Sequence, residues 1–239
     1  MRRFLFWSLC FCLLFPVGLS SCDGSDSAAV IFGGTTGKLT WTLTEDGVLT
    51  ITGEGPMPDY RDGGTSETPP WYPHVNRISS LTIGEGVTRI GDYAFMLCSF
   101  VTKVVIPESV TSMGDWAFRV CTGLQEAYIG DGVTEIAAKA FAECTALKTV
   151  VIGKSIQRIG DQAFNTRSSW DQMTLEKITV LFDDIASGSF PVLESGSRGV
   201  FPKPGGWDLV SYKIYVPKGT KAEYQKNWSD YSSLIVEMQ

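Results

Sequence analysis

The sequence predicts a β-rich solenoid, an elongated array of short repeats, and three observations lead to this prediction. Four Ala-Phe pairs place a phenylalanine every 23 residues, at Phe95, Phe118, Phe141 and Phe164. When the repeats are set to begin at Ile78, Val101, Leu124 and Leu147, 31 of 32 equivalent core positions are apolar, and Arg167 is the exception. The composition, with 19% charged residues and 25 glycines, is typical of a β- and turn-rich extracellular module. A fixed period in the twenties indicates repeats that fold only by stacking on one another.

Each repeat is predicted to contain a short strand, a second extended segment and one helical turn. The apolar residues at positions one, four and six form the pattern LxxLxL, which is Val101, Val104 and Ile106 in the second repeat. This alternation predicts a half-buried strand and is the motif of a leucine-rich repeat. The sequence VTxIG follows and predicts the second extended segment. The aspartates after it are predicted to cap a helical turn that carries Ala-Phe inward. They are Asp92, Asp115 and Asp161.

The repeats are predicted to occupy residues 78–182, behind an N-terminal β cap at residues 31–77. In this cap Leu39, Trp41 and Leu43 alternate with threonine, as in a half-buried hairpin. A three-residue loop with a left-handed Gly47 would place Leu43 opposite Leu49 and Trp41 opposite Ile51.

Residues 183–239 are predicted to form an irregular segment and a C-terminal strand–helix–strand cap. Ile214 and Val216 repeat the strand pattern, and residues 233–237 are the predicted final strand. Thr220 and Glu223 have the spacing of a capping box, which predicts a helix that ends near residue 226.

The first 30 residues predict export and a lipid anchor. Arg2 and Arg3 precede a mostly apolar stretch of 14 residues, which is too short for a membrane span of about 20 helical residues. Leu19-Ser20-Ser21-Cys22 then has the pattern of a lipoprotein cleavage site. We therefore expect a signal peptide at residues 1–21, lipidation of Cys22 and a flexible tether at residues 22–30. The protein would be held by its lipid at the outer membrane or cell surface. An ordinary secretory signal with an incidental cysteine is the alternative.

Of the other five cysteines, Cys10 and Cys12 lie in the predicted signal peptide, and Cys98, Cys121 and Cys144 share the 23-residue spacing of the phenylalanines. This spacing predicts a buried ladder of reduced thiols that pack as small apolar side chains. A metal site is not expected there because no histidine lies near them in the repeat pattern.

The sequence contains no pattern that predicts an enzyme or a cofactor. His74 is the only histidine, without a nearby nucleophile, and is expected to be structural. Asp59 and Asp62 lack the alternating order of a calcium loop, so no metal is expected. The net charge of −6 without a basic patch argues against nucleic acid as a partner.

The repeat LxxVxIPxxVTxIGxxAFxxC, seen at residues 101–121, resembles the BspA-like (Treponema-type) leucine-rich repeats. Such proteins are typical of Bacteroides-like bacteria and other host-associated microbes. Residues 37–60 and residues 213–231 resemble the two caps of this family. The resemblance implies surface display and, in some members, adhesion to host or matrix proteins. It implies no catalytic residues.

The exposed face of the predicted strands is the candidate partner-binding site. Positions three and five of each repeat point away from the core and should form two columns along this face. The fifth position gives Val105, Tyr128, Val151 and Thr179, and the third gives Lys103, Glu126, Thr149 and Lys177. An apolar centre with a polar border is typical of a protein-binding patch, and Tyr128 would be its anchor. The alternative is that β-propensity alone selected these side chains.

A second functional hypothesis is a glycan-binding or envelope-scaffolding lipoprotein that uses exposed aromatic rings of the end regions. The candidate rings are Trp71, Tyr72, Trp207 and Trp228. Burial of these rings within the caps, which we expect, would count against this hypothesis. The partner is thus an unidentified host or bacterial surface protein, or a glycan.

Overall fold

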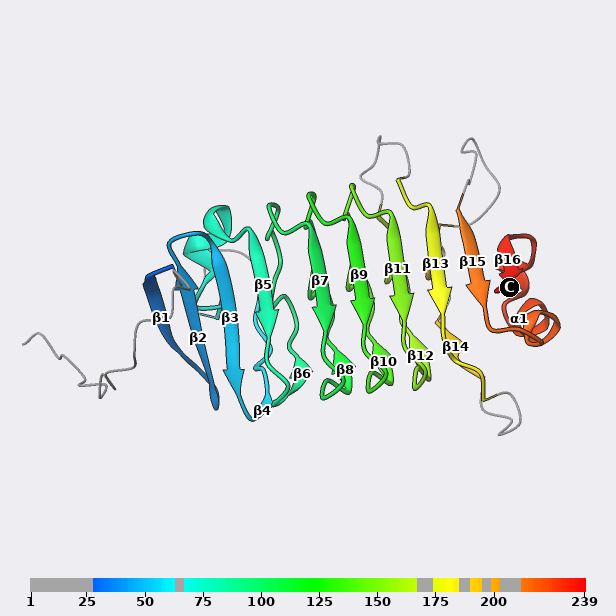
Figure 1. Ribbon diagram of the computed structural model, residues 1–239, viewed down its shortest axis with the longest axis horizontal. Coiled ribbons are helices and arrows are strands. Elements are labelled where there is room, and N and C mark those ends of the chain that lie inside the picture. The colour runs from blue at the N-terminus through cyan, green and yellow to red at the C-terminus, as the bar shows by residue number, and fades with distance from the viewer. Residues whose placement is uncertain (1–27, 63–66, 167–173, 185–189, 195–198, 203–211) are drawn as a thin grey trace, which may run out of the picture.

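A computed structural model describes residues 28–62, 67–166, 174–184, 190–194, 199–202 and 212–239. The chain forms a solenoid in which the longer strands stand side by side in one row, with the shorter strands behind them (Figure 1). The predicted β-rich solenoid is confirmed. None of the helices in the described ranges is long and apolar enough to cross a membrane.

The N-terminal cap is a four-stranded sheet in the order β1-β2-β3-β5. Its strands are β1 (Val30–Thr36), β2 (Leu39–Thr44), β3 (Val48–Gly53) and β5 (Ser80–Ile83). Gly47 has a φ of 86°, and Leu43 pairs with Leu49 and Trp41 with Ile51, so the predicted hairpin register is confirmed. The 3-10 helix η1 (Tyr72–Arg77) then leads into β5. In it, His74 stacks on Phe32 of β1 with ring centroids 3.7 Å apart.

The repeats build two parallel sheets of six strands each. The front sheet consists of β7 (Lys103–Ile106), β9 (Glu126–Ile129), β11 (Thr149–Ile152), β13 (Lys177–Val180), β15 (Lys213–Val216) and β16 (Ile235–Glu237). The back sheet consists of β4 (Gly55–Pro56), β6 (Val87–Ile90), β8 (Ser112–Met113), β10 (Glu135–Ile136), β12 (Arg158–Ile159) and β14 (Val192–Leu193). Both strands predicted for each repeat are therefore present in it.

The predicted helical turn is wrong, and so are the N-caps assigned to Asp92, Asp115 and Asp161. The residue after each aspartate has a left-handed backbone, with φ of 55° at Tyr93 and 59° at Trp116, which interrupts a helical run. The segment forms short turns, such as the bond from the N–H of Met96 to the carbonyl of Tyr93 at 3.2 Å, and alternate N–H groups bond to the next repeat. The N–H of Tyr93 donates to the carbonyl of Asp115 at 3.0 Å, and the N–H of Phe95 to that of Ala117 at 2.8 Å. These bonds form a third ladder between repeats.

The phenylalanines of the Ala-Phe pairs form a continuous stack through the core. Phe118 lies 5.2 Å from Phe95 and 5.1 Å from Phe141 between ring centroids. The stack is longer than the four predicted rings. Trp71 of the cap lies 5.6 Å before Phe95, and Phe201 lies 5.4 Å after Phe164.

The cysteine ladder is confirmed as buried and free of disulfides at Cys98, Cys121 and Cys144. The thiol of Cys121 donates to the carbonyl of Phe95 at 3.2 Å, and that of Cys144 to the carbonyl of Phe118 at 3.1 Å. Each thiol therefore bonds to the preceding repeat. Arg167, the polar residue at the next ladder position, lies outside the described residues.

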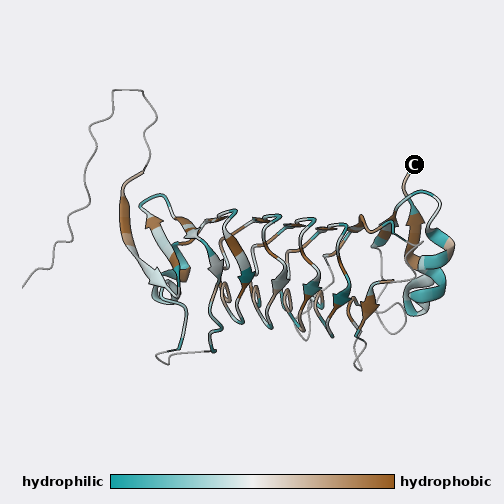
Figure 2. Ribbon diagram, turned by 90° about the horizontal axis from the view of Figure 1, so that it is seen from below, coloured by the Kyte–Doolittle hydropathy of each residue, from teal (hydrophilic) through white to brown (hydrophobic). Residues whose placement is uncertain are grey.

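The C-terminal cap contains helix α1 (Lys221–Asn227) and the 3-10 helix η3 (Ser229–Leu234). Figure 2 shows α1 as a mostly hydrophilic helix at the end of the solenoid. The predicted helix is present, but its capping box is not. Thr220 has the helical angles φ −105° and ψ −11°, and its hydroxyl donates to the carbonyl of Pro217 at 2.6 Å. The final strand begins at Ile235 rather than at Ser233 because η3 extends to Leu234.

Candidate functional site

The register of the front sheet aligns the predicted candidate residues into two columns. β7 pairs with β9, β9 with β11 and β11 with β13, all in parallel. One column contains Lys103, Glu126, Thr149 and Lys177, and the other contains Val105, Tyr128, Val151 and Thr179. We call the surface formed by these eight residues the strand face.

The polar column is linked to Tyr128 through Lys103. The ammonium of Lys103 lies 3.6 Å from the carboxylate of Glu126 and 4.5 Å from the centre of the Tyr128 ring. The side chains of Lys103 and Glu126 are 54% and 44% exposed, and such exposed pairs contribute about 0–1 kcal/mol. The cluster therefore orients the Tyr128 ring more than it stabilises the fold.

The apolar column is most exposed at its first strand. Val105 is 55% exposed, and its strand β7 is the last hydrogen-bonded strand of the front sheet. Tyr128 and Val151 are half-buried. Thr179 was expected on the exposed face, but it is only 8% exposed. Its larger column neighbours Val151 and Tyr215 flank it on both sides, so the accessible centre ends at Val151.

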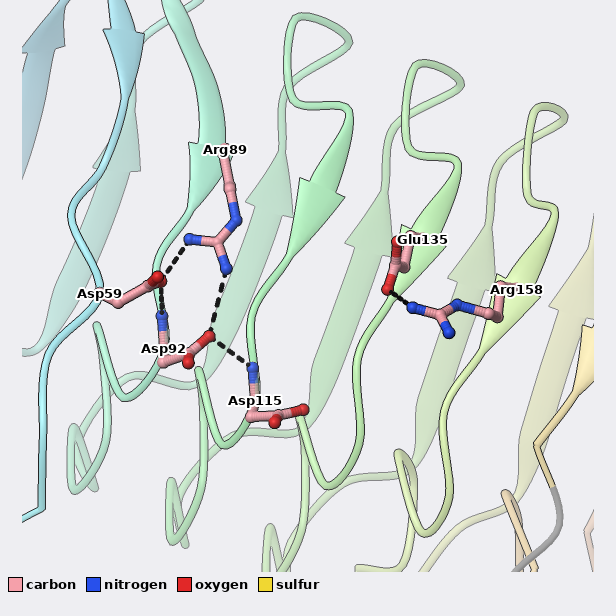
Figure 3. Close-up of polar contacts among 6 residues, drawn as sticks. All are labelled: Asp59, Arg89, Asp92, Asp115, Glu135 and Arg158. Carbon is pink, nitrogen blue, oxygen red and sulfur yellow. Dashed lines mark hydrogen bonds and ion pairs between the residues drawn. The ribbon is translucent and has the colours of Figure 1, made fainter.

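A chain of polar contacts on the back of the molecule was not foreseen from the sequence (Figure 3). The guanidinium of Arg89 bonds to Asp59 and, at 3.2 Å, to Oδ1 of Asp92. Oδ1 of Asp59 also accepts the backbone N–H of Asp92 at 3.0 Å, and Oδ1 of Asp92 accepts that of Asp115 at 3.0 Å. The recurrence of Asp before Ala-Phe could have indicated these contacts between repeats, but it was interpreted as helix capping. Farther along, Arg158 bonds to Glu135 and Glu194.

The two carboxylates have pKa values shifted in opposite directions. Burial raises the pKa of Asp59, but hydrogen bonds from Asp92 and Arg89 outweigh it and lower the pKa overall. Burial and the neighbouring charge of Asp59 raise the pKa of Asp92. The two carboxylates therefore form one cluster of interacting charges with Arg89.

A cavity of about 780 Å³ lies between the N-terminal cap and the first repeat. Its lining includes Thr35, Asp59, Arg61, Asp92 and Tyr93. At one wall the hydroxyls of Thr36 and Tyr60 are hydrogen-bonded at 2.5 Å, and burial raises the pKa of Tyr60 to about 12.

Two of the four aromatic residues proposed for glycan binding are buried in the caps, as expected. The indole N–H of Trp71 donates to the carbonyl of Ala94 at 2.8 Å, and that of Trp228 to the carbonyl of Pro191 at 3.0 Å. Both rings have exposures of 3% or less, so neither can stack on a sugar. Tyr72 is partly buried, and Trp207 lies outside the described residues.

Cys22 and the signal segment also lie outside the described residues, so the predicted lipid anchor stays a prediction. Within the part of the chain that is described, no three His, Cys, Asp or Glu side chains gather into a group that could hold a metal ion.

The sequence is similar to a known repeat family and to solved bacterial proteins. Residues 72–190 match the family described as "BspA type Leucine rich repeat region", in six copies. No curated protein matches the chain.

Two crystal structures share the fold. A leucine-rich repeat protein from Eubacterium ventriosum is 26% identical with a TM-score of 0.57, over 81% of this chain and 46% of its own. The pneumococcal vaccine antigen PcpA is 17% identical with a TM-score of 0.56, over 83% of this chain and 46% of its own. The chain thus spans less than half the length of either protein.

Proposed function

Because the chain belongs to the BspA-type leucine-rich-repeat family, we propose that it binds a protein partner through the strand face while a lipid at Cys22 anchors it to the cell surface. The family match and the similarity to an antigen support the coarser description of a protein-interaction repeat protein. Leucine-rich-repeat proteins of this kind are typically non-catalytic.

The observation that carries the proposal is a run of apolar side chains across three adjacent strands, exposed at Val105 and half-buried at Tyr128 and Val151. The fold does not require apolar side chains at these positions, because water contacts them there. A Tyr ring oriented by a lysine, with charged neighbours, has the composition of an interaction hot spot. Truncation of such an anchor typically weakens binding by 2 kcal/mol or more, about 30-fold.

The proposed location depends on the N-terminal sequence. A charged start, a short apolar stretch and Cys22 after two serines support export followed by lipidation. β1 begins at Val30, so only a short segment would separate the lipid from the folded cap. The strand face would then be held close to the membrane that carries the protein.

The test compares binding by Tyr128→Ala and Tyr215→Ala. Tyr215 is a matched control because it occupies the same column and has Lys177 5.0 Å from its ring centre. Host and bacterial surface extracts are passed over the wild-type protein, and the affinity of the captured partner is then measured for each variant.

We expect Tyr128→Ala to lose at least 10-fold in affinity, Lys103→Glu to weaken binding, and Tyr215→Ala to bind as wild type does. Melting temperatures should stay nearly unchanged, since all three side chains are at least partly exposed. Wild-type affinity in both Tyr128→Ala and Lys103→Glu would rule out the strand face.

A further inference from the structure

We propose that the cavity between the N-terminal cap and the first repeat binds a neutral carbohydrate, with a sugar ring stacked on Tyr93 and its hydroxyls bonded to Asp59 and Asp92. This site shares no residue with the strand face and is independent of the partner proposed for it.

Tyr93 supplies a fixed aromatic wall. Its ring stacks on Trp116 with centroids 6.2 Å apart and an interplanar angle of 13°. Trp116 belongs to the following repeat, whereas the cavity that Tyr93 lines lies on the side of the cap. A left-handed backbone is rare for a bulky residue and costs about 1–3 kcal/mol, which the stacked repeats offset. The result is a ring directed out of the core.

Cations on Trp116 hold this aromatic pair in place. The Lys139 ammonium and the Arg119 guanidinium lie 4.5 Å and 4.7 Å from the Trp116 ring centre. Arg119 is itself bonded to Glu143 at 3.0 Å. Side chains of its own repeat and of the next repeat therefore pack on Trp116. Tyr93 is the ring of the pair that can contact a ligand in the cavity.

The two carboxylates supply oriented hydrogen-bond acceptors. Asp59 and Asp92 each use Oδ1 for a backbone N–H and for Arg89. Within the described part of the chain, no hydrogen bond to Oδ2 of either residue is present. A carboxylate whose first oxygen is fixed presents its second oxygen in a defined direction, and hydroxyl groups donate to it strongly.

The charges around the cavity favour an uncharged ligand. The carboxylates of Asp59 and Asp92 disfavour an anion, and the Arg89 guanidinium bonded to both compensates part of their charge. Arg61 at the rim is paired with Glu67 at 2.6 Å and provides no unpaired positive charge. The cavity volume of about 780 Å³ lies within the range of small-molecule sites. A neutral polyhydroxylated ring, with one apolar face and hydroxyl donors at its edge, meets all these conditions.

The test is a printed array of neutral, sialylated and sulfated oligosaccharides, followed by calorimetric titration of each one bound. The variants are Tyr93→Ala, which removes the wall, and Thr35→Trp, which fills the cavity from an exposed position on β1. Tyr128→Ala is the control, because the strand face is remote from these residues. The fluorescence of Trp116, whose ring stacks on Tyr93, provides a second readout of ligand binding.

We expect neutral oligosaccharides to bind, at least 10-fold weaker binding in Tyr93→Ala and Thr35→Trp, and no change in Tyr128→Ala. Thermal melts establish that the variants are folded. Any of four outcomes would overturn the proposal. They are no binding at millimolar concentrations, a preference for the anionic sugars, a requirement for a divalent cation, and unchanged binding in both cavity variants. Loss of protein binding in Tyr128→Ala is scored separately, so the two proposals can fail independently.

Discussion

The carboxylate of Asp92 accepts a hydrogen bond from the backbone N–H of Asp115, its equivalent in the next repeat, at 3.0 Å. Asp59 of the cap makes the same bond to the N–H of Asp92, also at 3.0 Å. Both are visible in Figure 3. Each aspartate thus fastens its own layer to the next one rather than starting a helix. The cap is attached to the repeats by the same contact that joins two repeats.

This relationship predicts that Asp59→Ala is more damaging than Asp59→Asn. Alanine removes the acceptor for the Asp92 N–H and the partner of Arg89, whereas asparagine keeps an oxygen that can accept the backbone bond. We expect Asp59→Ala to lower the free energy of unfolding by about 1–2 kcal/mol, and Asp59→Asn by clearly less. Urea denaturation measures both values. Equal losses would mean that the backbone bond contributes nothing.

The same residue makes a prediction about pH. The lowered pKa of Asp59 contributes stability that is present above its unfolded pKa of about 3.9 and is lost as the pH falls through its native pKa. The contribution of Asp92 to stability has the opposite sign, because its pKa is raised by burial and by the charge of Asp59.

In Asp59→Asn the pKa of Asp92 should therefore fall, since a repelling charge is removed and Arg89 keeps only one carboxylate partner. Carboxyl carbon NMR titration follows this shift. An unchanged Asp92 titration would contradict the proposed coupling.

The core and strands were predictable from the sequence because apolar spacing reports burial directly. Val104 and Ile106 alternate with exposed residues on β7, and the hairpin register followed from the position of Gly47. The helical turn was mispredicted because Asp-x-Ala-Phe is compatible with both an N-cap and a left-handed turn. Bonds to the next repeat decide between them, and local sequence does not contain that information.

The extent of the aromatic stack and the cavity could not be predicted for a related reason. Phe201 follows a break in the 23-residue period, and Trp71 precedes the first repeat outside an Ala-Phe pair. The cavity combines Thr35, Asp59 and Tyr93, which are separated in the chain and meet only when the cap closes on the first repeat. The alignment of the strand face was predictable from alternation, but the burial of Thr179 was not.

The phenylalanine stack predicts similar costs for two core truncations. The sequence alone suggests that Phe118→Ala should be worse than Phe164→Ala, because the repeat after Phe164 is irregular. Phe201 extends the stack beyond Phe164, so both rings have a neighbour on each side. Each substitution should cost about 3–5 kcal/mol, which thermal and urea unfolding measure. Phe100→Ala, at a ring that is 58% exposed, is the control and should cost about 0.5 kcal/mol or less. A far smaller loss for Phe164→Ala would mean that Phe201 does not support it.

The buried thiols should resist labelling until the chain unfolds. Burial raises the pKa of Cys98 and Cys121 well above the ordinary thiol value, and the thiolate is the reactive species. Native protein treated with a maleimide at pH 7 should show slow modification of Cys98, Cys121 and Cys144, whereas protein in urea should react within minutes. Peptide mass spectrometry assigns each site. Rapid native labelling at any of the three would show that the ladder opens to solvent.

The lipid anchor is tested by Cys22→Ala, with Cys12→Ala as the matched control. Cys12 lies in the segment predicted to be removed, so its loss should change neither processing nor localisation. Cys22→Ala removes the thiol that would carry the lipid, so radiolabelled palmitate should no longer be incorporated. A protein without acyl chains loses about 0.8 kcal/mol of membrane affinity for each methylene that would have been buried, so the variant should leave the membrane fraction.

Equal palmitate labelling of the wild type and Cys22→Ala would refute lipidation at this residue. Retention of Cys22→Ala in the membrane fraction would instead assign the anchor to the apolar segment itself.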